Sequence, residues 1–399
     1  MIIFLLPKTN IYIYINLNIQ TSIDIPTPFI SHSLSKYLNE SKTQIHYHYL
    51  NWDIYKKYTN TYEYIHTIIP KKRNSISKYK PISRSYFKMI ELIEEFKFDL
   101  DTTNTVHSFH LAEGPGGFIE AVSNYRKKKI IDTSNDMYVG MTLTENNNYN
   151  SENPPGWKKI NHFLKENQNI FIESGLDGGN ILSLSNFIYI YEKYGDTMDF
   201  ITADGGFDFS TDFNNQEINI APLLYGQIVF ALCMQKKGGS FVLKIFDCFM
   251  KHTIELLMLL SSMYEEVYIT KPNTSRSANS EKYIVCKRYI YTSVQIYPYL
   301  FFSFKEMIEK KETYIDSFFK IKIPLFFIKK IEKYNSFFGE KQLENINQTI
   351  DLIEEINNIK VTNKKVSNYE YCKINSLINN NIVKCIHWCI KHNIPIYTH

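Results

Sequence analysis

The sequence has few cysteines and no long apolar run, and each shortage excludes a class of protein. Six cysteines are spread over 399 residues without the close spacing of a disulfide framework, so we expect a reducing compartment. No apolar stretch approaches the length of a membrane span, and we expect no membrane partner. The apolar start, residues 1–6, is short, lacks a basic flank and is broken by Pro7, which argues against a signal peptide.

A strong charge of one sign and internal repeats are also absent. The formal net charge of +4 permits binding to a polyanion without arguing for it. Hydrophobic residues make up 44% and charged residues 22% of the chain, the balance of a globular protein with a sizeable core. The length allows one large domain with appendages or two domains.

Strands and helices alternate between residues 105 and 245, which predicts an α/β fold with a doubly wound, mostly parallel, seven-stranded sheet. We expect an N-terminal extension over residues 1–80, the α/β domain over 81–291 and a mostly helical C-terminal appendage over 292–399. A further strand is predicted over 11–19. The seven expected strands of the sheet are Val106–Ala112, Met137–Leu143, Ile170–Ile172, Phe200–Ala203, Ser240–Phe246, Glu266–Thr270 and Tyr283–Cys286.

A glycine-rich turn follows the first of these strands. Gly114, Gly116 and Gly117 remove side chains where the backbone must turn sharply and approach a ligand. A helix begins directly afterwards, so free backbone N–H groups would lie at the carboxyl edge of the sheet, the usual ligand crevice of open α/β folds. The turn lacks the Gly-Lys-Ser/Thr ending of a nucleotide-triphosphate loop and the full dinucleotide spacing, so taken alone it is equally consistent with a plain turn.

Two lysines and two acids accompany this turn. Asp204 ends the fourth strand before two glycines, Lys244 lies inside an apolar strand, and Glu281 begins the last strand. Lys88 lies on a helix expected to run to about Phe98. Each residue alone fits a simpler interpretation, as a turn former or a solvated lysine. Together they predict a site, because a lysine among apolar residues needs an acid partner.

Such a set suits the deprotonation of a weakly acidic hydroxyl. A free lysine has a pKa of about 10.4 and is a poor base while it is charged. Burial and a second nearby cation lower the pKa of a lysine and make the neutral amine available. Acids on either side would hold that amine in place.

Five segments in order carry a family resemblance. They are His110–Phe118, Gly140–Leu143, Thr202–Phe207, Gly238–Phe246 and Lys271–Glu281. Together they resemble the FtsJ/RrmJ-type ribose 2′-O-methyltransferases, above all the enzymes of eukaryotes and large DNA viruses that methylate the first nucleotides of capped mRNA. The resemblance covers roughly residues 80–290.

This resemblance implies a Rossmann-like methyltransferase fold and S-adenosylmethionine as the cofactor. It implies a Lys-Asp-Lys-Glu tetrad in which Lys244 is the base toward the ribose 2′-hydroxyl and no metal is required. The tetrad residues are Lys88, Asp204, Lys244 and Glu281. The implied cofactor contacts are Glu113, Gly114, Pro115, Gly116, Gly117, Phe118, Thr142, Asn180 and Asp204. Many relatives have acidic residues at the positions of His110 and Asn180, which are therefore departures from the family pattern.

The resemblance also implies capped mRNA as the substrate, with other capping enzymes as candidate partners. The candidate RNA phosphate contacts are Lys71, Lys72, Arg73 and Arg276, and a solvated surface is the alternative for each. Cys385, Cys389 and His392 have the spacing of a zinc site but equally that of one helix face, so we predict no metal.

Three functions stay open at this point. The first is cap-proximal 2′-O-methylation of mRNA. The second is the same chemistry on an internal ribose of rRNA or tRNA, and the third is a catalytically inactive subunit that only binds RNA. The expected location is the cytoplasm or nucleus, or a viral factory or virion if the source is a large DNA virus.

Overall fold

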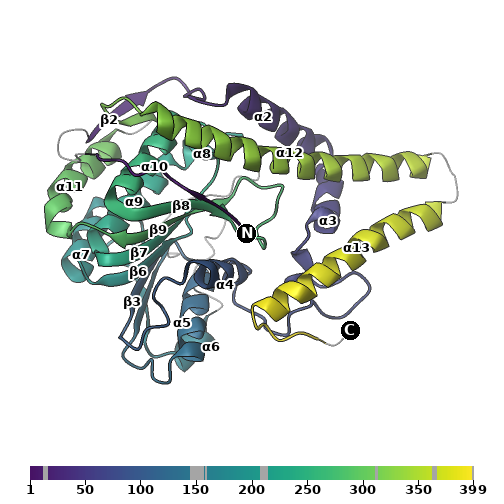
Figure 1. The fold of residues 1–399 in the computed structure, drawn as a ribbon, viewed down its shortest axis with the longest axis horizontal. Coiled ribbons are helices and arrows are strands. Elements are labelled where there is room, and N and C mark those ends of the chain that lie inside the picture. Colours follow the sequence, from purple (N-terminus) through teal and green to yellow (C-terminus); the bar gives the residue numbers. More distant parts are fainter. Residues whose placement is uncertain are drawn as a thin grey trace. The chain divides into compact units, whose positions relative to one another are not determined.

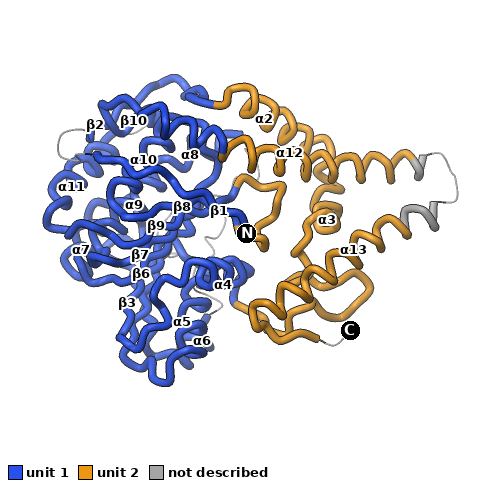
Figure 2. Tube along the Cα trace, viewed as in Figure 1, with its two compact units in different colours: residues 1–30, 82–271, 281–333 blue, residues 31–81, 272–280, 334–399 orange. Residues whose placement is uncertain are grey.

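The computed structural model describes residues 1–11, 17–143, 157, 160–206, 214–310, 313–361 and 366–397, without the side chains of 359–371. The chain forms two compact units, coloured separately in Figure 2. Unit 1 comprises Met1–Ile30, Ile82–Lys271 and Glu281–Lys333, and unit 2 comprises Ser31–Pro81, Pro272–Ser280 and Tyr334–His399. The domain boundaries expected at residues 80 and 291 stay predictions.

Unit 1 is built on an eight-stranded sheet with the strand order β1-β8-β9-β7-β6-β3-β4-β5 (Figure 1). Its strands are β1 (Ile2–Leu5), β3 (His107–Leu111), β4 (Met137–Met141), β5 (Ile170–Glu173), β6 (Met198–Ala203), β7 (Gln235–Ile245), β8 (Tyr264–Lys271) and β9 (Lys282–Tyr289). Strand β9 runs antiparallel to β7 and β8, and β1 runs antiparallel to β8. The strands from β7 to β5 in this order all pair in parallel, so the sheet is mostly parallel. The predicted α/β class and the seven predicted strands are confirmed.

The eighth strand, β1, was not predicted. It is formed by the short apolar start of the chain and pairs with the outer edge of β8, from Ile2 opposite Lys271 to Leu5 opposite Tyr268. An edge strand of four residues is too short to show a period in the sequence.

Helices cover the sheet of unit 1, and this unit also contains a separate two-stranded sheet. The helices are α4 (Ser85–Phe96), α5 (Gly117–Lys129), α6 (Asn161–Glu166), α7 (Leu184–Tyr194), α8 (Gln216–Asn219), α9 (Ala221–Met234), α10 (Lys251–Met263) and α11 (Ser293–Glu309). Every residue of α9 except Pro222 is buried, as its continuous apolar sequence requires. Strands β2 (Leu17–Ser22) and β10 (Tyr314–Phe319) pair antiparallel. The strand predicted over residues 11–19 therefore includes the start of β2, and residues 12–16 lie outside the described residues.

The topology brings the functional candidates to one edge of the sheet. Strand β3 pairs with β4 on one side and β6 on the other, both in parallel, so the winding of the sheet reverses at β3. Leu111 lies opposite Ala203, and Ala203 lies opposite Leu243. The glycine turn, Asp204 and Lys244 therefore follow one another across adjacent carboxyl ends, at the switch point where open α/β sheets bind ligands.

Unit 2 is mostly helical. It contains α2 (His32–Tyr47), α3 (Tyr49–Thr59), the 3₁₀ turn η1 (Glu63–Ile65), most of α12 (Leu325–Val361) and α13 (Val366–Lys391). Its core includes a cluster of Ile45, Ile346 and Ile350 that also packs against Ala278. The segment Pro272–Ser280 thus belongs to this core although it lies between two strands of unit 1 in sequence. Within the described ranges, no helix is both long enough and apolar enough to span a bilayer.

Candidate active site

The four residues of the predicted tetrad form two ion pairs in unit 1. Lys88 Nζ lies 2.7 Å from Glu281 Oε1, and both side chains are nearly buried. Lys244 Nζ lies 3.3 Å from Asp204 Oδ1 and donates a hydrogen bond of 2.7 Å to the Asp204 backbone oxygen. Each lysine therefore lies beside a carboxylate, which is the kind of partner that the sequence analysis expected for it.

The two pairs are electrostatically linked. Burial opposes ionisation of Glu281, but the ammonium groups of Lys88 and Lys244 outweigh it and hold the Glu281 pKa well below its usual range. Burial lowers the pKa of Lys88, and Glu281 acts in the opposite direction. Glu281 is therefore the shared anion of a site that contains more than one lysine.

Sequence reasoning missed two neighbours of these pairs, the half-buried Lys271 and the buried Tyr283. Lys271 Nζ donates to the Glu281 backbone oxygen at 2.9 Å, and burial lowers its pKa to about 7. The Tyr283 hydroxyl donates to Asp204 Oδ1 at 3.2 Å. Both residues lie in or beside the Lys271–Glu281 segment that carried the family resemblance. Their contacts were not visible in the sequence, because one runs to a backbone oxygen and the other depends on the register between strands.

The glycine turn after β3 shapes the second half of the site. Gly116 has a φ of 115°, which favours glycine, and it serves as the N-cap of α5. A Cβ on Gly117 would lie 2.1 Å from Ser85 Oγ, so this glycine allows α4 and α5 to approach closely.

Glu113 caps the helix that follows the turn. Its Oε1 accepts a hydrogen bond of 2.5 Å from the Phe118 backbone N–H, while its buried Oε2 has no hydrogen-bond partner among the described residues. Burial and then the charge of Asp204 raise the Glu113 pKa well above its usual range. A protonated carboxyl in this position has one O–H or oxygen left to offer to a ligand.

Thr142 and Asn180, the cofactor contacts predicted after β4 and β5, are fixed by contacts within the loops that follow these strands. The Asn180 side chain accepts from the Leu182 N–H at 2.9 Å and donates to Asp177 at 3.2 Å. A Cβ on Gly179 would lie 1.9 Å from the Thr142 backbone oxygen, which fixes the approach of the two loops. Sequence reasoning missed Asn186, whose buried amide bonds the backbone of Leu176, Asp177 and Asn180.

His110, the departure from the family pattern on β3, is a structural link. Its two ring nitrogens lie 2.9 Å from Ser108 Oγ and 2.8 Å from Thr202 Oγ1. Burial lowers its pKa to about 3, so the ring stays neutral. His110 therefore fills a polar position between β3 and β6 with both nitrogens already engaged.

The other predicted residues lie in unit 2. Lys71, Lys72 and Arg73 are exposed. Arg276 makes a bidentate ion pair with the buried Glu63, with N–O distances of 2.7 and 2.9 Å, so its guanidinium is engaged within the unit. The RNA contacts proposed for these four residues stay predictions.

Cys385 and Cys389 are buried in unit 2. Burial raises the pKa of each thiol to about 12, which keeps both protonated. Among the residues that the structure describes, no group of three or more His, Cys, Asp or Glu side chains could hold a metal ion.

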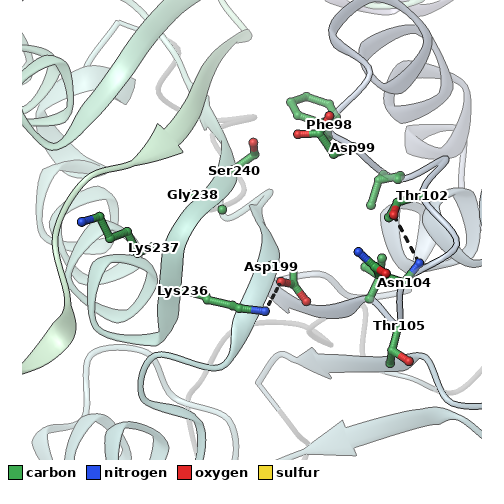
Figure 3. Close-up of a pocket in the computed structure, with 13 residues that line it drawn as sticks. Phe98, Asp99, Thr102, Asn104, Thr105, Asp199, Lys236, Lys237, Gly238 and Ser240 are labelled. Atoms are coloured by element: carbon green, nitrogen blue, oxygen red, sulfur yellow. Dashed lines mark hydrogen bonds and ion pairs between the residues drawn. The ribbon is translucent and has the colours of Figure 1, made fainter.

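A hollow of about 330 Å³ lies at the opposite, amino-terminal edge of the sheet in unit 1 (Figure 3). Lys236 pairs there with Asp199 at 3.0 Å, and Lys237 extends away from the other labelled side chains. Because the tetrad lies at the carboxyl edge, this hollow belongs to neither the proposed chemistry nor the glycine turn.

The strand order and the glycine turn at the switch point define a Rossmann-like α/β protein. The family model described as "FtsJ-like methyltransferase" matches residues 81–289, more than half of the chain, and the chain belongs to this family.

Similar proteins include cap-specific mRNA (nucleoside-2′-O-)-methyltransferase 2 of Danio rerio, 31% identical over 66% of this chain and 36% of that protein. The enzyme of the same name from Drosophila melanogaster is 29% identical over 53% of this chain and 31% of its own length. A probable methyltransferase of African swine fever virus is 31% identical over 52% of this chain and 49% of that protein. The chain thus spans about a third of the length of the two cap-specific relatives.

Proposed function

We propose that this protein transfers a methyl group from S-adenosylmethionine to the ribose 2′-hydroxyl of a cap-proximal nucleotide of mRNA. The family membership supports methyl transfer, and the names of several relatives support the capped substrate. The observation that carries the proposal is the contact of Lys244 Nζ with Asp204, at 3.3 Å from its carboxylate, beside the glycine turn.

The residues of the turn fit a cofactor with both polar and apolar parts. The unpartnered Glu113 Oε2 and the glycines at 114, 116 and 117 leave a polar atom and bare backbone at the switch point. The residues proposed to hold S-adenosylmethionine are Glu113, Gly114, Pro115, Gly116, Gly117, Phe118, Thr142, Asn180 and Asp204. When bound, this cofactor supplies a methyl group on a positively charged sulfur.

The chain's own side chains then have distinct roles. Lys244, in its uncharged amine form, accepts the proton of the 2′-hydroxyl, and its contact with Asp204 orients the amine and stabilises the ammonium that forms. Glu281, held by Lys88 at 2.7 Å, supplies the second negative charge near Lys244. Most of the rate gain comes from holding hydroxyl and methyl donor in line, for which a rigid, buried set of charges is suited.

Replacement of Lys244 tests this assignment. We expect Lys244→Ala to lower kcat on a short capped RNA by about 10²–10⁴-fold, because the proton acceptor is lost. Binding of S-adenosylmethionine, measured by calorimetry, should change little. Lys237→Ala, which removes an exposed lysine from the same strand, is the matched control. Turnover of Lys244→Ala close to the wild-type rate would contradict the proposed base.

The substrate is tested by comparing methyl acceptors. A capped transcript should be methylated in preference to the same transcript without a cap, and mass spectrometry of the product identifies the first or second nucleotide as the target. Equal methylation of both transcripts would favour an internal rRNA or tRNA ribose. Cofactor binding without turnover on any RNA would favour an inactive subunit. Other capping enzymes as partners, and the cytoplasmic, nuclear or viral-factory location, stay predictions.

A further inference from the structure

Unit 2 contains a cavity of about 440 Å³ that belongs to neither the tetrad nor the glycine turn. It lies between the loop around Pro70 and one face of helix α13, with Tyr58 of α3 also in its lining. Its volume falls within the usual range for small-ligand sites, roughly 300–1,000 Å³.

The α13 wall of this cavity has two chemically distinct rows. Ile374, Ile378 and Ile382 follow at four-residue spacing and form an apolar face. Asn375 and Asn379, also four apart, place two amides along the same cavity. An apolar wall beside paired donors and acceptors suits the face and the edge of a nucleobase.

The opposite wall carries positive charge on a tight turn. Lys72 N–H donates to the Ile69 oxygen at 2.9 Å, with Pro70 at the second position and Lys71 at the third. Lys71 has a φ of 63°, so the turn is of type II and places a lysine where glycine is favoured. Among the described residues that line the cavity, these two lysines are present and no carboxylate is.

We propose that this cavity binds one nucleotide of a single-stranded RNA, with its base on the isoleucine face and its phosphate at Lys71 and Lys72. A purely apolar ligand would not need the two lysines, and a cationic ligand would be repelled by them. Stacked bases and backbone phosphates are the two features that proteins use to hold single-stranded RNA without reading a long sequence. The inference rests on the proposed function only in taking RNA as the ligand.

The amide row provides the first test. Asn379→Asp changes an amide of the cavity lining to a carboxylate of the same shape, and we expect affinity for a fluorescently labelled single-stranded RNA to fall by about tenfold. Asn380→Asp adds the same charge on the neighbouring residue, which is equally exposed but outside the cavity lining, and should leave affinity within about twofold of the wild type. Fluorescence anisotropy measures both. Equal losses in the two variants would show a general charge effect and overturn the proposal.

The turn provides the second test. Lys71→Gly relieves the backbone and removes one charge, so we expect unchanged or higher thermal stability together with weaker RNA binding. The slope of log K against log salt should fall by about 0.7, the value for one phosphate contact to a single strand. Lys97→Gly is the matched control, because Lys97 also has a positive φ of 54° and is exposed but lies in unit 1. A loss of affinity for Lys97→Gly as large as for Lys71→Gly would refute the role of the turn.

Photocrosslinking places the nucleotide directly. RNA that contains 4-thiouridine should crosslink to peptides that contain Tyr58 or residues 374–382, and Asn379→Asp should weaken that crosslink. Crosslinks confined to unit 1, or crosslinks to unit 2 that excess unlabelled RNA fails to displace, would overturn the RNA assignment. These readouts need no methyl transfer, so they can succeed or fail independently of the Lys244→Ala experiment.

Discussion

Glu217 is a buried carboxylate that holds the start of α10. It accepts the backbone N–H groups of Phe249 and Met250, each at 2.9 Å. Burial, and then the charge of Asp247, raise its pKa from 4.5 to about 7. The acid therefore prefers to be protonated in the folded protein over a range where it would be ionised in the unfolded chain.

This shift predicts a stability that depends on pH. Because the folded pKa is the higher one, the stabilisation is complete below about pH 4.5 and is lost as pH rises through about 7. Between these two pH values, the free energy of unfolding of the wild type should fall by up to about 3 kcal/mol relative to that of Glu217→Gln. Urea unfolding of both proteins across this range measures the difference. His252, whose pKa burial lowers to about 4, is present in both proteins and cancels in the comparison.

The Lys88–Glu281 pair predicts an asymmetry between single and double replacement. Lys88→Met removes the nearest cation from a buried carboxylate, so we expect a loss of about 3 kcal/mol in the free energy of unfolding. Adding Glu281→Gln removes the carboxylate that has lost this cation and should recover much of that loss. Chemical denaturation of both variants is the measurement. A double variant no more stable than Lys88→Met would show that the pair contributes through packing alone.

At the residue scale, charged side chains beside strand ends were predictable from the sequence. Lys244 and Asp204 were marked by their positions in or after apolar runs, and the structure pairs them. The contact of Lys271 with Glu281 was not predictable, because it runs from a side chain to a backbone oxygen across a segment of another unit. The same holds for Gln227, whose Oε1 accepts from the Gly205 N–H at 2.9 Å and holds the loop after Asp204.

Helices α4 and α5 meet at a glycine, and this contact positions Lys88. A Cβ on Gly117 would lie 2.1 Å from Ser85 Oγ and 3.0 Å from the Tyr86 backbone nitrogen. We expect Gly117→Ala to cost about 1–3 kcal/mol of stability, because the helices must separate. We also expect kcat to fall, because α4 carries Lys88. Thermal unfolding and methyl-transfer assays measure the two effects.

A second replacement tests the cause of that loss. Ser85→Ala in the Gly117→Ala background removes the shortest clash but leaves the backbone contact, so partial recovery of both stability and kcat is expected. An unchanged double variant would place the cause in the remaining contact with the Tyr86 backbone nitrogen at 3.0 Å.

At the element scale, the sequence predicted the seven strands that have an apolar stretch, and each of them apart from β9 follows a helix. Strand β1 is apolar but only four residues long and follows no helix, and its place is fixed by pairing with β8 more than 260 positions away along the chain. The helical character of the C-terminal region was predictable from its pattern, but its packing against α3 and η1 was not.

Gln342 ties the segment Pro272–Ser280 to α12 in unit 2. Its Nε2 donates to the Ala278 oxygen at 3.1 Å, and its side chain is buried. We expect Gln342→Ala to accelerate amide hydrogen exchange in this segment by roughly 5–100-fold, the equivalent of one lost buried hydrogen bond. Exposed Gln348→Ala on the same helix is the control. Because Glu281 directly follows the segment, a lower kcat should accompany the faster exchange, and unchanged exchange would contradict this role of Gln342.

At the scale of the whole molecule, a division of the sequence into three consecutive regions could not show which distant stretches pack into the same compact unit. Unit 2 gathers residues 31–81, 272–280 and 334–399. Hydrophobic periodicity reports on each helix separately, and it carries no signal for which distant stretches share a core.

The interleaved path of the chain also limits how this protein can be recombined with its relatives. In a chimera that exchanged only the C-terminal helices, the nine residues Pro272–Ser280 would still come from this protein and would pack against helices from the relative. A working graft must transplant three stretches at once. The smallest of them is spliced between Lys271 and Glu281, so any mismatch in its length would be transmitted directly to the charged centre of the other unit.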